Sequence, residues 1–212
     1  MDRVIRECLL DEHNVRRVRG RAVGERVRIL GKACLWNARP AGVSIDTVVV
    51  HYICAVQRTP RSPYSEEAIL EIFCDLGVSS HYLVSRRGTV TRLVPEVERA
   101  WHAGGSIMPP PDNRRGVNDF SVGIELVATH SSGFTPSQYA ALADLCRAVA
   151  GQAGRAVRIL GHEHVAGARA VELGLRSDRK QDPGPAFDWP GLARQLGDGA
   201  RAAQPGLVYT RP

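Results

Sequence analysis

The chain has 212 residues, of which 43% are hydrophobic, 24% charged and 6% aromatic. This length and composition suit one packed domain and exclude a chain that is disordered throughout. The sequence contains no unbroken apolar stretch of about 18 residues, the length that a membrane-spanning helix needs. Charged residues already interrupt the first ten positions, so we expect neither a membrane span nor a signal peptide.

The formal net charge of +6 comes mainly from the N-terminal part of the chain. Residues 1–39 carry ten basic and five acidic side chains, so the other 173 residues have a net charge of only +1. No nucleic-acid-binding motif accompanies the Arg-rich stretch at 16–28, so a nucleic-acid-binding function is disfavoured, and weak contact of this stretch with RNA is the alternative left open. Only two basic residues are lysines, Lys32 and Lys180. A lysine is a compact cation whose pKa responds to its surroundings, which makes these two positions candidates for a special role.

The five cysteines are scattered and include no C-x-x-C pair: Cys8, Cys34, Cys54, Cys74 and Cys146. Their odd number and irregular spacing argue against a disulfide framework and against a cysteine-only zinc site. This pattern is typical of a reducing compartment, so we expect a cytoplasmic protein.

In chain order, residues 1–40 mix Arg-rich patches with scattered valines, which predicts a basic, partly ordered N-terminal extension before a domain at 41–212. A β-branched run without strict alternation at 46–54 predicts a strand that is covered on both faces. Residues 65–76 begin with a serine and two glutamates and keep apolar residues at helical spacing, which predicts a helix. Two apolar runs around an Arg-Arg-Gly turn predict a β-hairpin at 81–94.

The Gly- and Pro-rich residues 103–118 are predicted to form a loop. Further strands are predicted at 121–128 and 157–162, and a helix that begins with Thr-Pro lies between them at 135–150. The Ala- and Arg-rich stretch that follows holds one short helical candidate, 168–175. Strands that alternate with helices, together with one tight hairpin, predict an α/β fold with a central mixed β-sheet flanked by helices.

Two histidines, His51 and His162, lie at the carboxyl ends of predicted strands, where open α/β sheets present their sites. Taken singly, such a histidine is more often a packed core residue than a ligand. The rigid polar turn at 180–185 adds the carboxylate of Asp182 and, two residues earlier, Lys180. Two imidazoles and one carboxylate, with one position left open, are a ligand set of catalytic zinc.

Six short blocks occur in order along the chain: V-V-V-H at 48–51, V-S-S-H-Y-L-V at 78–84, R-A-W-H-A-G at 99–104, N-D-F-S-V-G-I-E-L at 118–126, G-H at 161–162 and R-K-Q-D-P-G-P-A-F-D-W at 179–189. Together they resemble the zinc-dependent N-acetylmuramoyl-L-alanine amidases of the type-2 amidase and peptidoglycan-recognition superfamily. The nearest likeness is to the cytoplasmic 1,6-anhydro-N-acetylmuramyl-L-alanine amidases. The resemblance implies the fold of that superfamily.

The resemblance also implies roles for five residues. His51, His162 and Asp182 would bind zinc, Glu125 would take a proton from the attacking water, and Lys180 would stabilise the oxyanion. Amide hydrolysis needs a base, a cation near the developing negative charge and a proton donor for the leaving amine, so the residue types agree with these roles. Glu125 lies among apolar neighbours, where an ionised carboxylate without a purpose would be unfavourable to bury.

Substrate recognition is less strongly implied than hydrolysis. In the resembling enzymes the W-H-A-G segment lines the groove, which makes Trp101 and His102 the candidate substrate-binding residues. Residues 163–179 are longer than the corresponding stretch of the family and are expected to form a loop or helix at the rim of the site. Where the anhydro-specific enzymes are expected to carry arginines for the stem peptide, this chain has Gly77 and Gly116.

Two hypotheses from different classes follow. The first is a zinc amidase that cleaves muropeptides in cell-wall recycling or turnover in the cytoplasm. The alternative is a non-catalytic module that binds peptidoglycan fragments. Such modules typically lose a zinc ligand, and the presence of all three ligand residues together with Glu125 and Lys180 favours the enzyme. Anhydro-muropeptides, ordinary muropeptides and polymeric peptidoglycan remain alternative substrates, and the sequence predicts no particular oligomeric state.

Overall fold

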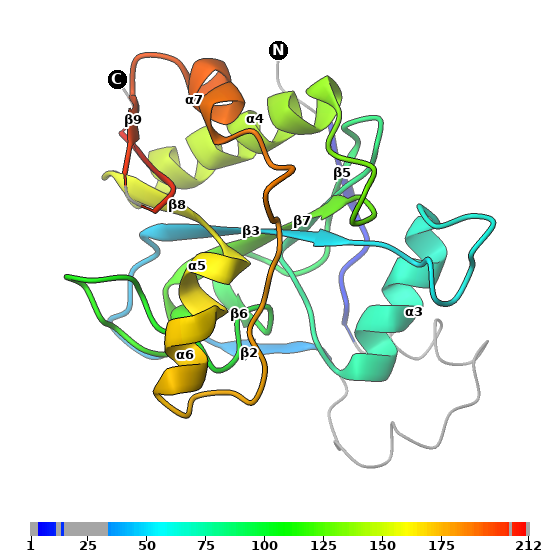
Figure 1. The fold of residues 1–212 in the computed structure, drawn as a ribbon, viewed down its shortest axis with the longest axis horizontal. Helices are drawn as coiled ribbons and strands as arrows, with labels where there is room; N and C mark the ends of the chain where they lie inside the picture. The colour runs from blue at the N-terminus through cyan, green and yellow to red at the C-terminus, as the bar shows by residue number, and fades with distance from the viewer. Residues whose placement is uncertain (1–3, 12–13, 15–33, 204, 211–212) are drawn as a thin grey trace.

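The computed structural model describes residues 4–11, 14, 34–203 and 205–210 (Figure 1). Its strands are β1 (Ile5–Glu7), β2 (Trp36–Ala38), β3 (Thr47–Ile53), β4 (Tyr82–Val84), β5 (Val90–Arg92), β6 (Glu98–Ala100), β7 (Ser121–Val127), β8 (Val157–Gly161), β9 (Ala200–Ala202) and β10 (Leu207–Tyr209). Its helices are α3 (Glu66–Leu76), the 3-10 helix η1 (Val117–Asp119), α4 (Pro136–Ala153), α5 (His162–Ala166), α6 (Ala168–Glu172) and α7 (Trp189–Leu196). All strands and helices predicted between residues 46 and 162 are present.

Eight strands form one sheet in the order β1-β5-β4-β7-β3-β8-β10-β9. The central strands β4, β7, β3 and β8 run parallel to one another. Antiparallel pairs flank them, β5 with β4 on one side and β10 with β8 on the other. The predicted central mixed sheet flanked by helices is therefore confirmed, and β2 and β6 add a small second sheet.

The two faces of the sheet are covered by different helices. In β3, Val48 and Val50 belong to the apolar cluster that includes residues of α4 and α7. Val49 belongs to a different cluster, together with Val165 of α5. Figure 1 shows α4 and α7 on one side of the sheet and α3, α5 and α6 on the other. Because successive strand residues alternate between faces, His51 lies on the same face as Val49, away from α4.

Helix α3 forms part of the wall on that face. Its N-cap residue Ser65 accepts a hydrogen bond from the backbone N–H of Ala68. The helix ends at Gly77, whose φ of 64° is in the left-handed region that favours glycine. Its buried residues include Ile69 and Phe73, which are 0% and 2% exposed. These contacts fix α3 beside the strand ends that carry the predicted site residues.

The described residues of the predicted N-terminal extension pack against the domain. Strand β1 pairs in parallel with β5, so that Ile5 lies opposite Val90. Leu10 and Leu35 are each 1% exposed and belong to the apolar cluster that contains α3. The Arg-rich stretch at 16–28 lies outside the described residues. The division of the chain at residue 40 stays a prediction, although part of the extension takes part in the sheet and the core.

The structure adds elements that have no counterpart in the prediction. Helix α5 precedes α6, which occupies the first part of the helical candidate at 168–175. After Trp189 the chain forms α7 and the antiparallel pair β9 and β10, and β10 extends the sheet beside β8. No helix within the described ranges combines the length and the apolar composition needed to cross a membrane.

Candidate active site

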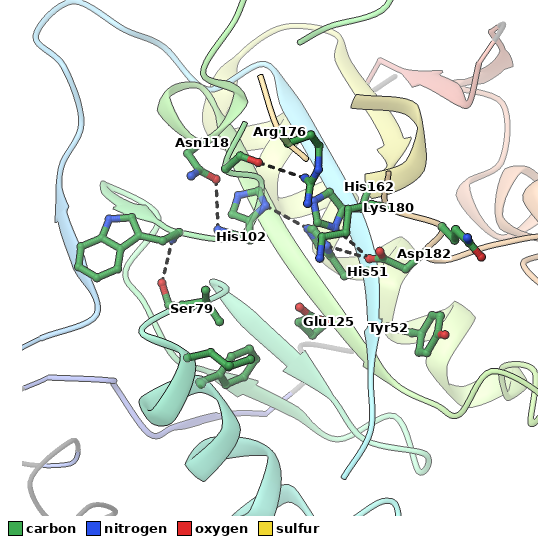
Figure 2. Close-up of a pocket in the computed structure, with 16 residues that line it drawn as sticks. His51, Tyr52, Ser79, His102, Asn118, Glu125, His162, Arg176, Lys180 and Asp182 are labelled. Carbon is green, nitrogen blue, oxygen red and sulfur yellow. Dashed lines mark hydrogen bonds and ion pairs between the residues drawn. The ribbon is translucent and has the colours of Figure 1, made fainter. Parts of the chain in front are cut away.

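Three predicted site residues, His51, His162 and Asp182, converge beside the central strands (Figure 2). Each offers one ligand atom, and these atoms all lie within 4.8 Å of one another. The Nδ1 atoms of His51 and His162 lie 3.1 and 3.2 Å from the same oxygen, Oδ2 of Asp182. Residues that are far apart in the sequence thus form one possible metal site.

The parallel strands explain why these side chains meet. His51 lies near the carboxyl end of β3, and the neighbouring β8 ends at Gly161, so that His162 is the first residue of α5. The backbone oxygen of Asp182 accepts a hydrogen bond of 2.8 Å from a backbone N–H of α5. Gly161 permits this approach, because a Cβ there would lie 2.6 Å from Cδ of Pro183.

A chain of hydrogen bonds fixes the orientation of His51. The hydroxyl of Ser121 donates to the carbonyl of Val117 at 2.6 Å, so its oxygen accepts from Nε2–H of His102 at 3.2 Å. The other ring nitrogen of His102, Nδ1, then accepts from Nε2–H of His51 at 3.0 Å. This assignment leaves Nδ1 of His51 facing Asp182, with its lone pair available to a cation.

The protonation states of Asp182 and His162 suit a metal ligand set, whereas the pKa of His51 shifts the other way. Burial raises the pKa of Asp182, but the neighbouring imidazoles of His162 and His51 outweigh it and hold this pKa far below the usual range. Burial and the neighbouring His51 lower the pKa of His162 to about 4, so its imidazole is neutral near pH 7. Burial lowers the pKa of His51, whereas Glu125 and Asp182 raise it above the ordinary value overall.

The donor set fits zinc better than a hard, oxygen-preferring cation. It has two imidazoles and one carboxylate, which leave one open position in a tetrahedral site. Nε2 of His162 is buried and has no hydrogen-bond partner among the described residues, which shows that this ring is not already satisfied at both nitrogens. The three residues therefore fit the zinc that the sequence predicts.

Glu125 lies next to His51 on the adjacent strand. The two residues are opposite each other in the parallel register of β3 and β7, so their side chains point to the same face. The Glu125 side chain is buried, and its Oε2 has no hydrogen-bond partner in the described part of the chain. Burial raises the pKa of Glu125 to about 7. A carboxyl group with a pKa in this range is suited to proton transfer near neutral pH.

The predicted site residues line one pocket of about 550 Å³. Its lining includes all seven residues predicted from the sequence: His51, Trp101, His102, Glu125, His162, Lys180 and Asp182. The backbone N–H of Lys180 donates to the carbonyl of Ala166 at 2.9 Å, which fixes this segment along α5. Within the described ranges the Lys180 ammonium forms no ion pair, so it remains available to a negative charge in the pocket.

The two candidate substrate-binding residues differ in their surroundings. Trp101 is only partly buried, and its indole N–H donates to Oδ1 of Asn37 at 2.7 Å. His102 is 8% exposed, and both of its ring nitrogens are engaged, one with His51 and the other with Ser121. The geometry therefore points to a supporting contact with His51 for His102, while substrate contact by either residue stays a prediction.

Several residues of the site were not identified from the sequence. Ser121 and Gly123 lie within the N-D-F-S-V-G-I-E-L block, but only their contacts reveal what they do. A Cβ at Gly123 would lie 2.4 Å from Cγ of His102, so glycine gives this ring its room on β7. Arg176 lines the pocket from the longer segment at 163–179, where no sequence pattern singled it out.

His102→Ala is expected to weaken zinc binding about 10- to 100-fold, the usual effect of removing a group that orients a metal-bound histidine. The substitution leaves Nε2–H of His51 without its acceptor, so the ring no longer presents Nδ1 in a fixed orientation. Competition with a chromophoric chelator measures the zinc dissociation constant. His130→Ala, at an exposed histidine, is the matched control. Equal dissociation constants for the two variants would contradict this role of His102.

Comparison with known proteins agrees with this geometry. The family described as N-acetylmuramoyl-L-alanine amidase matches residues 41–185. The 1,6-anhydro-N-acetylmuramyl-L-alanine amidase AmpD of Salmonella typhimurium is 42% identical over 116 residues, which are 54% of this chain and 55% of that protein. The chain thus spans about half the length of this curated relative.

Two solved structures share the fold. A selenomethionine AmpD derivative has a TM-score of 0.59 and 29% identity, over 76% of this chain and 89% of that one. The Escherichia coli amidase AmiD, in complex with anhydro-N-acetylmuramic acid-L-Ala-D-gamma-Glu-L-Lys, has a TM-score of 0.51 and 27% identity, over 77% and 63% of the two chains. The predicted type-2 amidase fold is confirmed, and the chain belongs to the N-acetylmuramoyl-L-alanine amidase family.

Proposed function

We propose that this protein is a zinc-dependent amidase that hydrolyses the bond between N-acetylmuramic acid and L-Ala of peptidoglycan stem peptides. The observation that carries the proposal is the convergence of His51, His162 and Asp182 beside Glu125 in one pocket. Membership of the amidase family supports the same activity. The 1,6-anhydro form of the sugar is the proposed substrate, because both AmpD and the AmiD complex are named for it.

His51, His162 and Asp182 would hold the zinc ion. Zinc, when bound, supplies Lewis-acid chemistry: it lowers the pKa of water and polarises a carbonyl group. The protein contributes a neutral imidazole at His162 and an ionised carboxylate at Asp182, both maintained near pH 7 by their surroundings. The chain of hydrogen bonds from Ser121 through His102 keeps His51 in the tautomer that presents Nδ1.

Glu125 and Lys180 would carry out the proton and charge transfers of the reaction. Glu125 takes a proton from the attacking water and then gives it to the departing amine of L-Ala, since its pKa of about 7 lies near the working pH. Lys180 stabilises the negative charge that develops on the carbonyl oxygen of the lactyl group. Release of the amine leaves a carboxylate on the sugar and an intact stem peptide.

The alternative function is a binding module that holds peptidoglycan fragments without cleaving them. The presence of a complete ligand set and of a buried carboxyl beside it supports the amidase instead. A module that only binds has no need for a buried carboxyl oxygen that lacks a partner among the described residues, such as Oε2 of Glu125 in this pocket.

Product analysis by mass spectrometry tests the proposal. The purified protein, loaded with zinc, is mixed with equal amounts of anhydro-muropeptides and ordinary muropeptides. We expect intact stem peptides to be released, with preference for the anhydro pool, and we expect a chelator to stop this release until zinc is restored. Binding of both pools without any cleavage would support the module and overturn the amidase.

The setting of the reaction is proposed to be cell-wall recycling in the cytoplasm. Small anhydro-muropeptides are turnover fragments, which suits a pocket of about 550 Å³. None of the five cysteines, all of which belong to the described residues, forms a disulfide.

A further inference from the structure

Arg176 reaches the candidate active site from outside the predicted ligand and catalytic positions. It follows α6 in the segment at 163–179 and lines the same pocket as Lys180 and the metal-ligand cluster. Its side chain is 12% exposed, so the guanidinium is largely withdrawn from bulk water. Figure 2 shows Arg176 next to the pocket, joined to the 103–105 loop by a hydrogen bond.

Two contacts position Arg176 without using all of its donors. Nη1 donates to the carbonyl of Gly104 at 3.2 Å, and Nε donates to the carbonyl of Asp178. Nη2 forms an ion pair with Asp178 at 3.7 Å, which is longer than a hydrogen bond, and the Asp178 side chain is 69% exposed. Within the described ranges, both Nη2 donors and one Nη1 donor therefore have no hydrogen-bond partner.

The backbone around Arg176 is also closely packed. A Cβ at Gly105 would lie 2.5 Å from the carbonyl oxygen of Leu175 and 3.2 Å from Cβ of Arg176. Gly105 has a φ of 62°, so the loop needs glycine for its conformation as well as for space. The arginine is thus set between two segments in a defined position, as a residue that recognises a fixed group must be.

We infer that Arg176 is a specificity-determining residue that binds the α-carboxylate of the D-Glu residue in the stem peptide. The inference rests on the proposed function. D-Glu linked through its γ-carboxyl keeps its α-carboxylate free, and it follows the L-Ala whose amide is cleaved. This is the negative charge of the stem peptide nearest to the scissile bond, because L-Ala carries none. A guanidinium with donors still available binds a carboxylate through two parallel hydrogen bonds.

The alternative is that Arg176 only joins the 163–179 segment to Gly104. In that case its loss would alter the pocket for every substrate to the same extent. If it binds the carboxylate, its loss affects only substrates that carry that group. Comparing two substrates that differ only in the α-carboxylate therefore distinguishes carboxylate binding from a purely structural role of Arg176.

The test compares two anhydro-N-acetylmuramyl peptides that are identical except at the second residue. One carries D-Glu with its free α-carboxylate, and the other carries the α-amide, D-isoglutamine. The wild-type protein is expected to show a kcat/KM about 10- to 100-fold higher for the acid, the range for a charge-assisted hydrogen bond. Arg176→Gln is expected to lose this preference, with little change for the amide. Arg176→Lys should recover only part of it, because an ammonium lacks the fork.

The matched control is Arg194→Gln, the same change at a side chain of α7 that is 72% exposed. It should keep the wild-type ratio of acid to amide. Equal losses on both substrates in Arg176→Gln, or no preference in the wild type, would overturn the assignment. Binding of the two peptides, measured by isothermal titration calorimetry, gives an independent comparison. If the wild type cleaves neither peptide, the proposed hydrolysis fails, while the binding ratios still decide the role of Arg176.

Discussion

Glu125→Ala is expected to lower kcat about 10²- to 10⁴-fold, the usual contribution of a general base, while zinc remains bound. The carboxyl group lies opposite His51 in the strand register but is not one of the three converging ligand groups. Its removal therefore takes away proton transfer and leaves the ligand set complete. The measurement combines single-turnover kinetics on an anhydro-muropeptide with zinc content by mass spectrometry.

The control is Glu172→Ala, at an exposed glutamate of α6. The fold of the Glu125→Ala protein is expected to persist, because the substitution removes a buried carboxyl oxygen that lacks a partner among the described residues. Zinc loss in Glu125→Ala would show that this residue supports the metal. A kcat near that of the wild type, with zinc bound, would exclude Glu125 as the base.

Asp182→Ala should abolish both zinc binding and muropeptide cleavage, to the level of the chelated wild type. Oδ2 of Asp182 lies within 3.2 Å of Nδ1 of both histidines, so its loss removes the one anionic ligand from the centre of the cluster. Two imidazoles remain, which is one ligand fewer than a catalytic zinc site normally has. Zinc titration followed by activity at each metal concentration measures both effects.

Asp198→Ala, which removes an exposed carboxylate near the C-terminus, is the control for Asp182→Ala. Circular dichroism with chelator present compares the metal-free proteins and separates zinc loss from misfolding. Retention of wild-type zinc affinity in a folded Asp182→Ala protein would remove this residue from the ligand set. Zinc bound at wild-type affinity with no cleavage would assign Asp182 to the chemistry alone.

The central strands were predictable because β-branched apolar runs have few alternatives to a buried strand. The runs at 46–54, 121–128 and 157–162 became β3, β7 and β8, and His51 and His162 lie close together near the ends of the first and the third. Their meeting follows from parallel pairing, which brings the carboxyl ends of neighbouring strands to the same edge.

The peripheral strands were not predictable in the same way. All three residues of β1 are exposed, so no apolar pattern marks this strand, and its pairing with β5 comes from backbone hydrogen bonds. The strands β2 and β6 are also short, with only one buried residue between them, and each depends on the other for its pairing. Tertiary contacts decide whether such short segments form strands.

The residues that position His51 and line the pocket could not be predicted from the sequence either. The sequence places His102 and Ser121 in motif blocks, but the direction of each hydrogen bond depends on which partner satisfies the Ser121 hydroxyl. Arg176 enters the pocket because the segment after α6 packs on Gly105. A single sequence contains no signal for such loop packing.

The pairing of His51 with Glu125 across β3 and β7 has an evolutionary consequence. Deleting one residue from either strand would send its reactive side chain to the opposite side of the sheet. The same change in length within 103–118, which lies between strands, would leave this register intact. Loop length can therefore vary around the pocket at little expense to the strand register that places His51 opposite Glu125.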